Sequence, residues 1–185
     1  MKTLRQAMAI GIGAIATFGA VCLTARSEGN ASGRWDSSQF YRPNELSIDL
    51  FGSGSIGQQT IDNFSGTRVT EDVRLGAGVG INCFFTRHFG LGGEAYTENT
   101  ADNLVDSASL NLLCRFPIGE SGLAPYLLGG GGYQFDVIEQ WLVNAGAGLE
   151  FRFHKNWGLF FDARYVFAEE TENYGVGRAG VRLSF

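Results

Sequence analysis

The sequence predicts an all-β protein, an eight-stranded antiparallel up-and-down transmembrane β-barrel preceded by a signal peptide. First, apolar residues alternate with polar residues or glycine through eight segments, the period of a β-strand. Second, most of these segments run for about 10–14 residues, whereas a tilted membrane-spanning strand needs about 9–11. Third, the chain has 27 glycines and 13% aromatic residues among 185 residues. Such a composition is typical of many short strands rather than helices.

The start of the chain has the features of a secretory signal peptide, which we assign to residues 1–25. A short basic segment, 1–5, precedes a largely apolar and charge-free stretch, 7–23, and small residues follow at 24–25. The apolar stretch is short for a membrane-spanning helix, which needs about 20 residues. An uncleaved anchor is the alternative, and the sequence leaves the cleavage point open.

Residues 26–44 are polar and contain glycine and serine, so we expect a flexible leader. Trp35, Phe40 and Tyr41 are candidate anchors at a membrane interface, where aromatic rings gather. The predicted barrel then occupies residues 45–185.

The connections between the eight segments alternate in length. The short set is 86–88, 117–122 and 154–156, and the longer set is 54–71, 99–105, 136–139 and 169–173. Barrels of the outer membrane have short periplasmic turns and longer external loops. The short set is therefore expected on the periplasmic side.

The 86–88 and 154–156 turns fix a register for two strand pairs. The first gives the inward pairs Phe84/Gly90, Asn82/Gly92, Gly80/Glu94, Gly78/Tyr96 and Gly76/Glu98. The second gives the inward pairs Arg152/Gly158, Glu150/Phe160, Gly148/Asp162, Gly146/Arg164 and Asn144/Val166. The outward pairs of the same two strands run from Phe153/Trp157 to Val143/Phe167, and all are apolar or aromatic. Most inward pairs set one glycine against a larger residue. An eight-stranded barrel has an interior just wide enough for side chains to fill, so this pairing is suited to it.

The inward row is charged, and enclosed charges must be paired. We predict an interior polar network of Asp49, Arg74, Glu94, Glu98, Glu150, Asp162, Arg164 and Arg178, with Arg115, Arg152 and Arg182 in the same row. A proton or ion path is the functional alternative, although a filled interior leaves little room for flow. The outward row is apolar, and exposure of so large an apolar surface to water would be unfavourable. An apolar exterior around a polar interior indicates a membrane barrel.

Aromatic residues gather at the ends of the predicted strands, as in the two belts of membrane barrels. The periplasmic rim is predicted to hold Phe85, Phe89, Phe116, Phe153, Trp157 and Phe185. The outer rim is predicted to hold Trp141, Tyr165 and Phe167.

The C-terminal residues carry a family resemblance. Arg178, Gly180, Leu183 and Phe185 are spaced as a polar residue, a glycine two residues on, and hydrophobic residues at the third-last and last positions. This end, and the segment 124–133, resemble the small eight-stranded outer-membrane β-barrel family of OmpA membrane domains, OmpX and opacity-type proteins. The resemblance implies the outer membrane of a Gram-negative bacterium, with lipid as a partner. It also implies that the barrel assembly machinery reads Arg178, Gly180, Leu183 and Phe185 as its signal.

The leading functional prediction is a non-enzymatic outer-membrane protein with a structural or surface-contact role, in which loops bind a surface ligand. The alternatives are a lipid-modifying enzyme and a narrow pore. Both histidines, His88 and His154, fall in predicted periplasmic turns, and no serine–histidine–acid geometry is available at the outer rim. No catalytic, cofactor or metal site is predicted. The net charge of −5 argues against nucleic acid as a partner.

Overall fold

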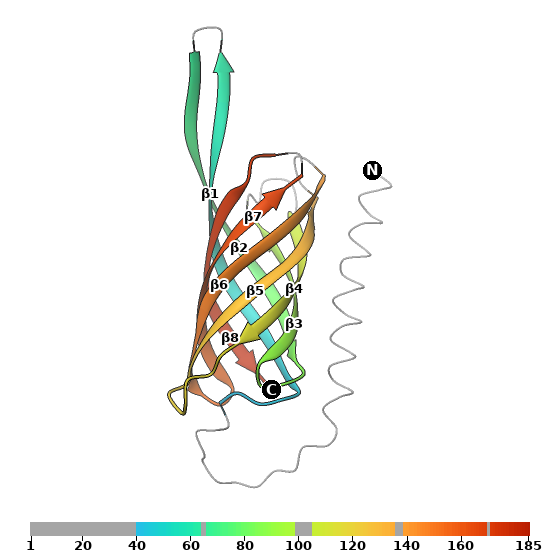
Figure 1. Cartoon of the computed structure of the whole chain (residues 1–185), viewed down its shortest axis with the longest axis vertical. Helices are drawn as coiled ribbons and strands as arrows, with labels where there is room; N and C mark the ends of the chain where they lie inside the picture. Colours follow the sequence, from blue (N-terminus) through green and yellow to red (C-terminus); the bar gives the residue numbers. More distant parts are fainter. Residues whose placement is uncertain (1–39, 64–65, 99–104, 136–138, 170) are drawn as a thin grey trace.

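The described residues form a closed eight-stranded barrel. The computed structural model describes residues 40–63, 66–98, 105–135, 139–169 and 171–185. The strands are β1 (Glu45–Asn63), β2 (Gly66–Phe84), β3 (Phe89–Thr97), β4 (Ser107–Arg115), β5 (Leu123–Gln134), β6 (Gln140–His154), β7 (Trp157–Ala168) and β8 (Tyr174–Ser184). Each pairs antiparallel with the next, and β8 closes on β1, as Figure 1 shows. The predicted all-β class, strand number and up-and-down order are confirmed.

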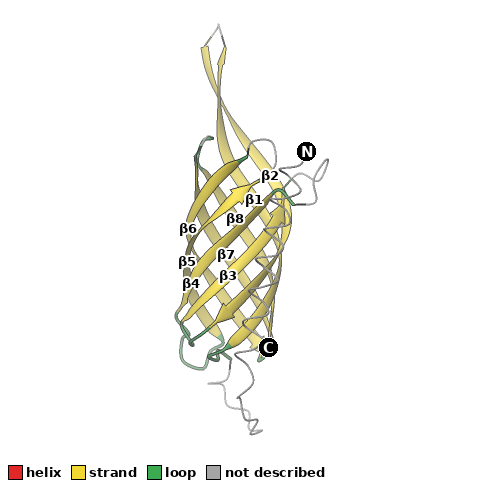
Figure 2. Cartoon of the chain, turned by 90° about the vertical axis from the view of Figure 1, so that its right-hand side faces the viewer, coloured by secondary structure: helices red, strands yellow, loops and turns green. Residues whose placement is uncertain are grey.

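The two rims of the barrel differ in their connections. We call the rim with the β2–β3, β4–β5 and β6–β7 turns the turn end, and the opposite rim the loop end. Glu45 and Phe185 both lie at the turn end, and the strands tilt steeply between the rims (Figure 2). The predicted signal peptide, 1–25, and most of the predicted leader lie outside the described residues. Among the residues that are described, no helix is long and apolar enough to cross a membrane.

The predicted registers are confirmed except for two pairs. Four of the five β2–β3 pairs occur, among them Gly80 with Glu94, while the fifth falls beyond the end of β3. All five inward β6–β7 pairs occur, among them Glu150 with Phe160. The outward pair Phe153/Trp157 is wrong, because an irregularity between Arg152 and His154 brings His154 opposite Trp157.

The prediction of a loop over residues 54–71 is wrong for most of its length, because these residues belong to β1 and β2. β1 and β2 continue as a paired ladder as far as Asn63 and Gly66, and Figure 1 shows this hairpin projecting beyond the loop end. The pairing of β1 with β8 stops at Ile56, and that of β2 with β3 stops at Ala77. Beyond the barrel the strands need no lipid-facing apolar row, so the alternation that identifies the other segments is missing there.

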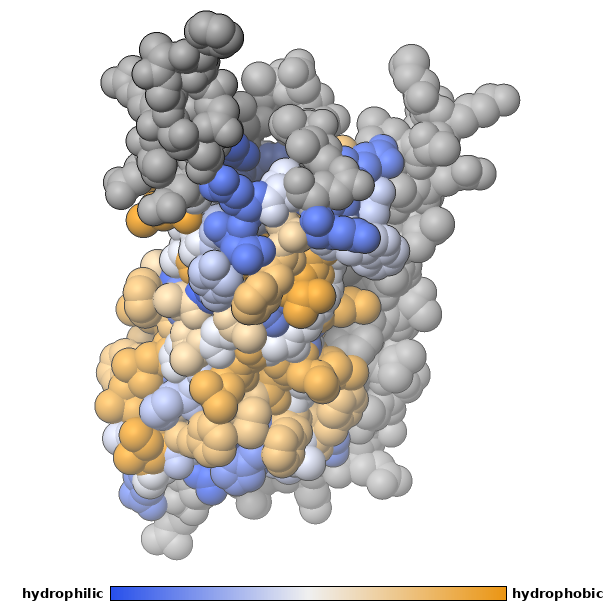
Figure 3. Space-filling view, turned by 45° about the horizontal axis from the view of Figure 1, so that its top comes forward, coloured by the Kyte–Doolittle hydropathy of each residue, from blue (hydrophilic) through white to orange (hydrophobic). Residues whose placement is uncertain are grey.

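The strands present an apolar outer face and a polar inner face. Neighbouring residues show it clearly: Leu112 is 67% exposed and Leu113 6%, and Val143 is 59% exposed and Leu142 5%. Figure 3 shows apolar residues over the flank of the barrel, with hydrophilic residues gathered towards the rims. The predicted aromatic rows are also exposed, including Phe89 and Trp157 at the turn end and Trp141 at the loop end. The predicted orientation of the two faces is confirmed.

Tyr41 corrects the prediction of an interface anchor. Its side chain is 3% exposed, because it lies beneath the turn end of the barrel rather than on its outer surface. The segment from Phe40 to Asn44 leads from this position into β1.

Candidate functional site: the ion-pair network of the barrel interior

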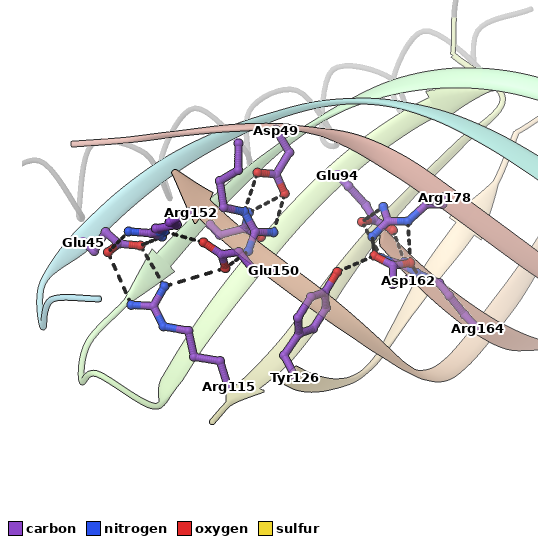
Figure 4. Close-up of polar contacts among 12 residues, drawn as sticks. Glu45, Asp49, Glu94, Arg115, Tyr126, Glu150, Arg152, Asp162, Arg164 and Arg178 are labelled. Carbon is purple, nitrogen blue, oxygen red and sulfur yellow. Dashed lines mark hydrogen bonds and ion pairs between the residues drawn. The ribbon is translucent and has the colours of Figure 1, made fainter. Parts of the chain in front are cut away.

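The inner face of the barrel gathers its charged side chains into two clusters, drawn in Figure 4. The turn-end cluster consists of Glu45, Asp49, Arg115, Glu150, Arg152 and Arg182. The loop-end cluster consists of Glu94, Asp162, Arg164 and Arg178. All ten residues are buried. The period of two places them inside, since each belongs to the inward row of its strand.

Arg182 on β8 joins three strands within the turn-end cluster. Its Nε and Nη2 each donate to Asp49 on β1, at 2.7 Å to Oδ1 and 2.7 Å to Oδ2. Its Nη1 donates to Glu150 Oε2 on β6 at 2.6 Å. Asn82 on β2 donates to the same Asp49 carboxylate at 2.8 Å. The closing β1–β8 pair is thus tied to β6, the second strand along from β8, by charge-assisted hydrogen bonds.

Glu45 on β1 is shared by two arginines from other strands. Arg115 Nη1 lies 2.9 Å from Glu45 Oε1, and Arg152 Nη2 lies 2.6 Å from the same oxygen. Arg152 also donates from Nε to Glu150 Oε1 at 2.5 Å. The carboxylates of Glu45 and Glu150 therefore neutralise arginines that would otherwise be buried without a partner.

The loop-end cluster has the same design. Arg178 donates to Asp162 at 2.9 and 2.7 Å and to Glu94 at 2.6 Å. Arg164 donates to both carboxylates as well, at 3.1 Å to Asp162 Oδ1 and 3.1 Å to Glu94 Oε2. The Tyr126 hydroxyl donates to Asp162 Oδ2 at 2.8 Å.

Aromatic rings fill the space between the clusters. Arg178 lies 4.5 Å from the centre of the Phe51 ring, and Arg182 lies 5.0 Å from that of Phe160. Phe51 and Phe160 meet edge to face at 6.3 Å. The guanidinium groups are therefore held by cation–π contacts in addition to their carboxylates.

Inward glycines make room for these side chains. A Cβ on Gly148 would lie 2.5 Å from Tyr126 Cζ, and one on Gly78 would lie 2.5 Å from Phe51 Cζ. A Cβ on Gly180 would lie 2.7 Å from Phe51 Cβ. The glycine-against-large pairing is thus a packing requirement of the interior, as expected for so narrow a barrel.

The two clusters are electrically balanced. Five carboxylates face five guanidinium groups, and each charged group contacts at least one of opposite sign. Within the described residues, the interior has a cavity of only ≈ 20 Å³, towards the loop end, lined partly by Glu94 and Asn144. The buried Asn144 Oδ1 has no hydrogen-bond partner, so one water molecule fits both the volume and the chemistry.

The structure separates two predicted network residues from the rest. Arg74 is exposed on the projecting part of β2, and Glu98 is half-buried just after β3. Neither belongs to the two clusters, because both lie at the loop end, beyond the enclosed part of the interior. Glu45 and Tyr126 are the contributors that the sequence analysis did not name. The inward parity of Ser47 and Asp49 extends to Glu45, whereas the glycine run beside Tyr126 hides its parity.

Groups suited to acid–base or metal chemistry are sparse. His88 lies in the β2–β3 turn, with its ring Nδ1 3.0 Å from the Arg115 carbonyl oxygen, and His154 ends β6 at the same rim. No group of three or more histidine, cysteine or acidic side chains in the described part of the chain could hold a metal ion.

Solved structures share this architecture. The N-terminal β-barrel domain of Pseudomonas aeruginosa OprF is similar with a TM-score of 0.57 and 20% identity, over 77% of this chain and 98% of that one. Ail, the attachment invasion locus protein of Yersinia pestis, gives a TM-score of 0.54 and 18% identity, over 76% and 98%. Neisserial surface protein A gives 0.53 and 14%, over 76% and 97%.

No family model and no curated protein matches the chain. At these identities the solved structures establish architecture alone. Their likeness to this chain extends to the closed eight-stranded barrel described above, in which β8 pairs with β1. The chain has the fold of the small eight-stranded outer-membrane β-barrels.

Proposed function

We propose that this chain is an integral protein of the outer membrane of a Gram-negative bacterium, non-enzymatic and non-conducting, with a structural or surface-contact role. The observation that carries the proposal is the pairing of an apolar outer face with a packed, charge-balanced interior. The outer face requires lipid, and the interior offers ions no continuous path. In this orientation the turn end faces the periplasm and the loop end faces outwards.

The external surface would then consist of the β1–β2 hairpin and three acidic connections. Residues 98–106, 135–139 and 169–173 contain aspartate or glutamate and no lysine or arginine. Ail has been solved in complex with the heparin analogue sucrose octasulfate, a polyanion. Such a ligand is disfavoured here, because acidic loops repel it. Loops bearing this charge are suited to neutral or basic surface partners.

The proposal is tested by folding the protein into detergent and then into planar lipid bilayers. A folded barrel migrates faster on a gel before heating than after it, and we expect that difference here. We also expect no discrete conductance steps. Stable conductance steps would favour the narrow pore instead. Release of fatty acid from phospholipid or lipopolysaccharide by the folded protein would favour the lipid-modifying enzyme.

A further inference from the structure

The side chains at the turn end are more deeply buried than their positions in the strands explain. Glu45 is the first residue of β1 and Arg115 the last of β4, and Arg152 lies close to the end of β6. Residues at the mouth of a barrel meet water unless something covers them. Yet Glu45 and Arg115 are 0% exposed and Arg152 is 1% exposed.

The cover is the segment that precedes β1. The Tyr41 hydroxyl donates to the Gly122 carbonyl oxygen at 2.6 Å, which anchors the ring to the β4–β5 turn on the far wall. The ring lies 4.8 Å from the Arg115 guanidinium carbon and 4.6 Å from that of Arg152. One aromatic side chain therefore stacks with both arginines that hold Glu45.

The backbone of the same segment completes the closure. Arg115 Nη2 donates to the Arg42 carbonyl oxygen at 3.3 Å, and Arg152 Nη1 donates to that of Phe40. The Arg42 amide donates to Glu45 Oε2 at 3.3 Å. The same two amino groups also donate to Glu45 Oε2, Arg115 Nη2 at 3.4 Å and Arg152 Nη1 at 2.8 Å. Each therefore joins Glu45 to the backbone of this segment, which helps to satisfy the donors of a buried guanidinium.

The local sequence explains how the chain turns beneath the barrel. Pro43 is followed by Asn44, which has a φ of 54°. Proline at the second position and asparagine with positive φ at the third is the pattern of a type II turn. The turn reverses the chain so that Tyr41 lies under the mouth while Glu45 points into it.

We propose that residues 40–45 form a stopper that seals the turn end of the barrel interior and keeps water from the turn-end cluster. The stopper rests on the barrel fold, whatever the surface role of the protein. It is held by hydrogen bonds and cation–π contacts rather than by a strand ladder, so it can open while the barrel stays folded. Burial raises the pKa of Tyr41, and its hydroxyl therefore stays a donor at neutral and mildly alkaline pH.

The test measures access to a buried position directly above the stopper. Ser47 on β1 points inward and is 0% exposed. A Ser47→Cys variant is prepared in the full chain with its three native cysteines replaced by alanine. The folded protein in detergent is treated with a cationic, membrane-impermeant methanethiosulfonate. Tyr41→Ala is expected to raise the labelling rate at position 47 at least about tenfold, because the interior opens locally at this end.

Two further variants make the result decisive. Tyr41→Phe keeps the stacked ring and loses the hydroxyl, so its labelling rate should lie between those of the parent and Tyr41→Ala. Tyr133→Ala removes a ring that contacts Trp141 at the loop end, and it should leave the rate unchanged. Faster gel migration before heating verifies that each variant is folded. Rapid labelling of the parent, or equal rates in the parent and both Tyr41 variants, would overturn the stopper.

Discussion

At the scale of single residues, the interior arginines do most to specify the barrel. Arg182 belongs to β8 and contacts carboxylates from β1 and β6, so one side chain connects the closing β1–β8 pair with β6. A buried ion pair adds little when compared with well-packed apolar residues, but removal of one partner leaves a buried charge uncompensated. Replacement of any single member of the network is therefore expected to destabilise the barrel.

Replacement of Arg182 tests that sensitivity. Among the residues that the structure describes, Arg182→Met leaves the Asn82 amide as the side-chain partner of the Asp49 carboxylate. The substitution should lower the free energy of unfolding by about 3–5 kcal/mol. Urea unfolding in lipid vesicles, followed by the gel shift, measures the change. Lys155→Met in the exposed β6–β7 turn is the control and should leave the urea midpoint unchanged. Equal midpoints for Arg182→Met and the unaltered protein would show that the ion pair does not stabilise the barrel.

At the scale of elements, β8 combines packing with a proposed recognition role. Arg178 and Gly180 face inward, where one binds Asp162 and the other leaves space for Phe51 and Phe160. Phe185 follows the strand, is 40% exposed, and donates its amide to the Leu46 carbonyl oxygen at 2.8 Å. The interior therefore explains the first half of the proposed assembly signal, and leaves the exposed end for recognition.

Deletion of Phe185 separates these two roles. The interior contacts of β8 do not involve this residue, so the truncated chain should still fold in detergent with an unfolding midpoint close to that of the full chain. In cells the amount of heat-modifiable protein in the outer membrane should fall severalfold. Equal amounts of the two chains in the membrane would contradict a role for Phe185 in assembly.

At the scale of the whole molecule, the sequence predicts the barrel well, because one rule applies along most of its length. Alternation and short turns predict the faces and the register, down to Gly80 against Glu94 and Glu150 against Phe160. The alternation is lost where its physical cause, contact of one strand face with lipid, is missing. The projecting hairpin contacts no lipid band, so its strands lack the pattern, and Arg74 and Glu98 leave the enclosed interior.

The stopper could not be predicted from the alternation for a different reason. Tyr41 precedes the first strand, and its burial depends on a reversal of the chain beneath the barrel mouth. Alternation carries no information about such a reversal. The local signal is Pro43 followed by Asn44, which predicts a tight turn but not the surface against which the turn packs.

The most direct test of the central claim compares neighbouring methyl groups that should face opposite ways. The methyl-labelled protein is placed in lipid nanodiscs containing a doxyl-labelled acyl chain, and line broadening is measured by NMR. Leu112, Leu127 and Val143 should broaden strongly, since each is more than half exposed on the outer face. Their neighbours Leu113, Leu128 and Leu142 are 6%, 5% and 5% exposed and should broaden far less. Equal broadening within each pair, or the reverse pattern, would contradict a barrel with an apolar exterior and a charged interior.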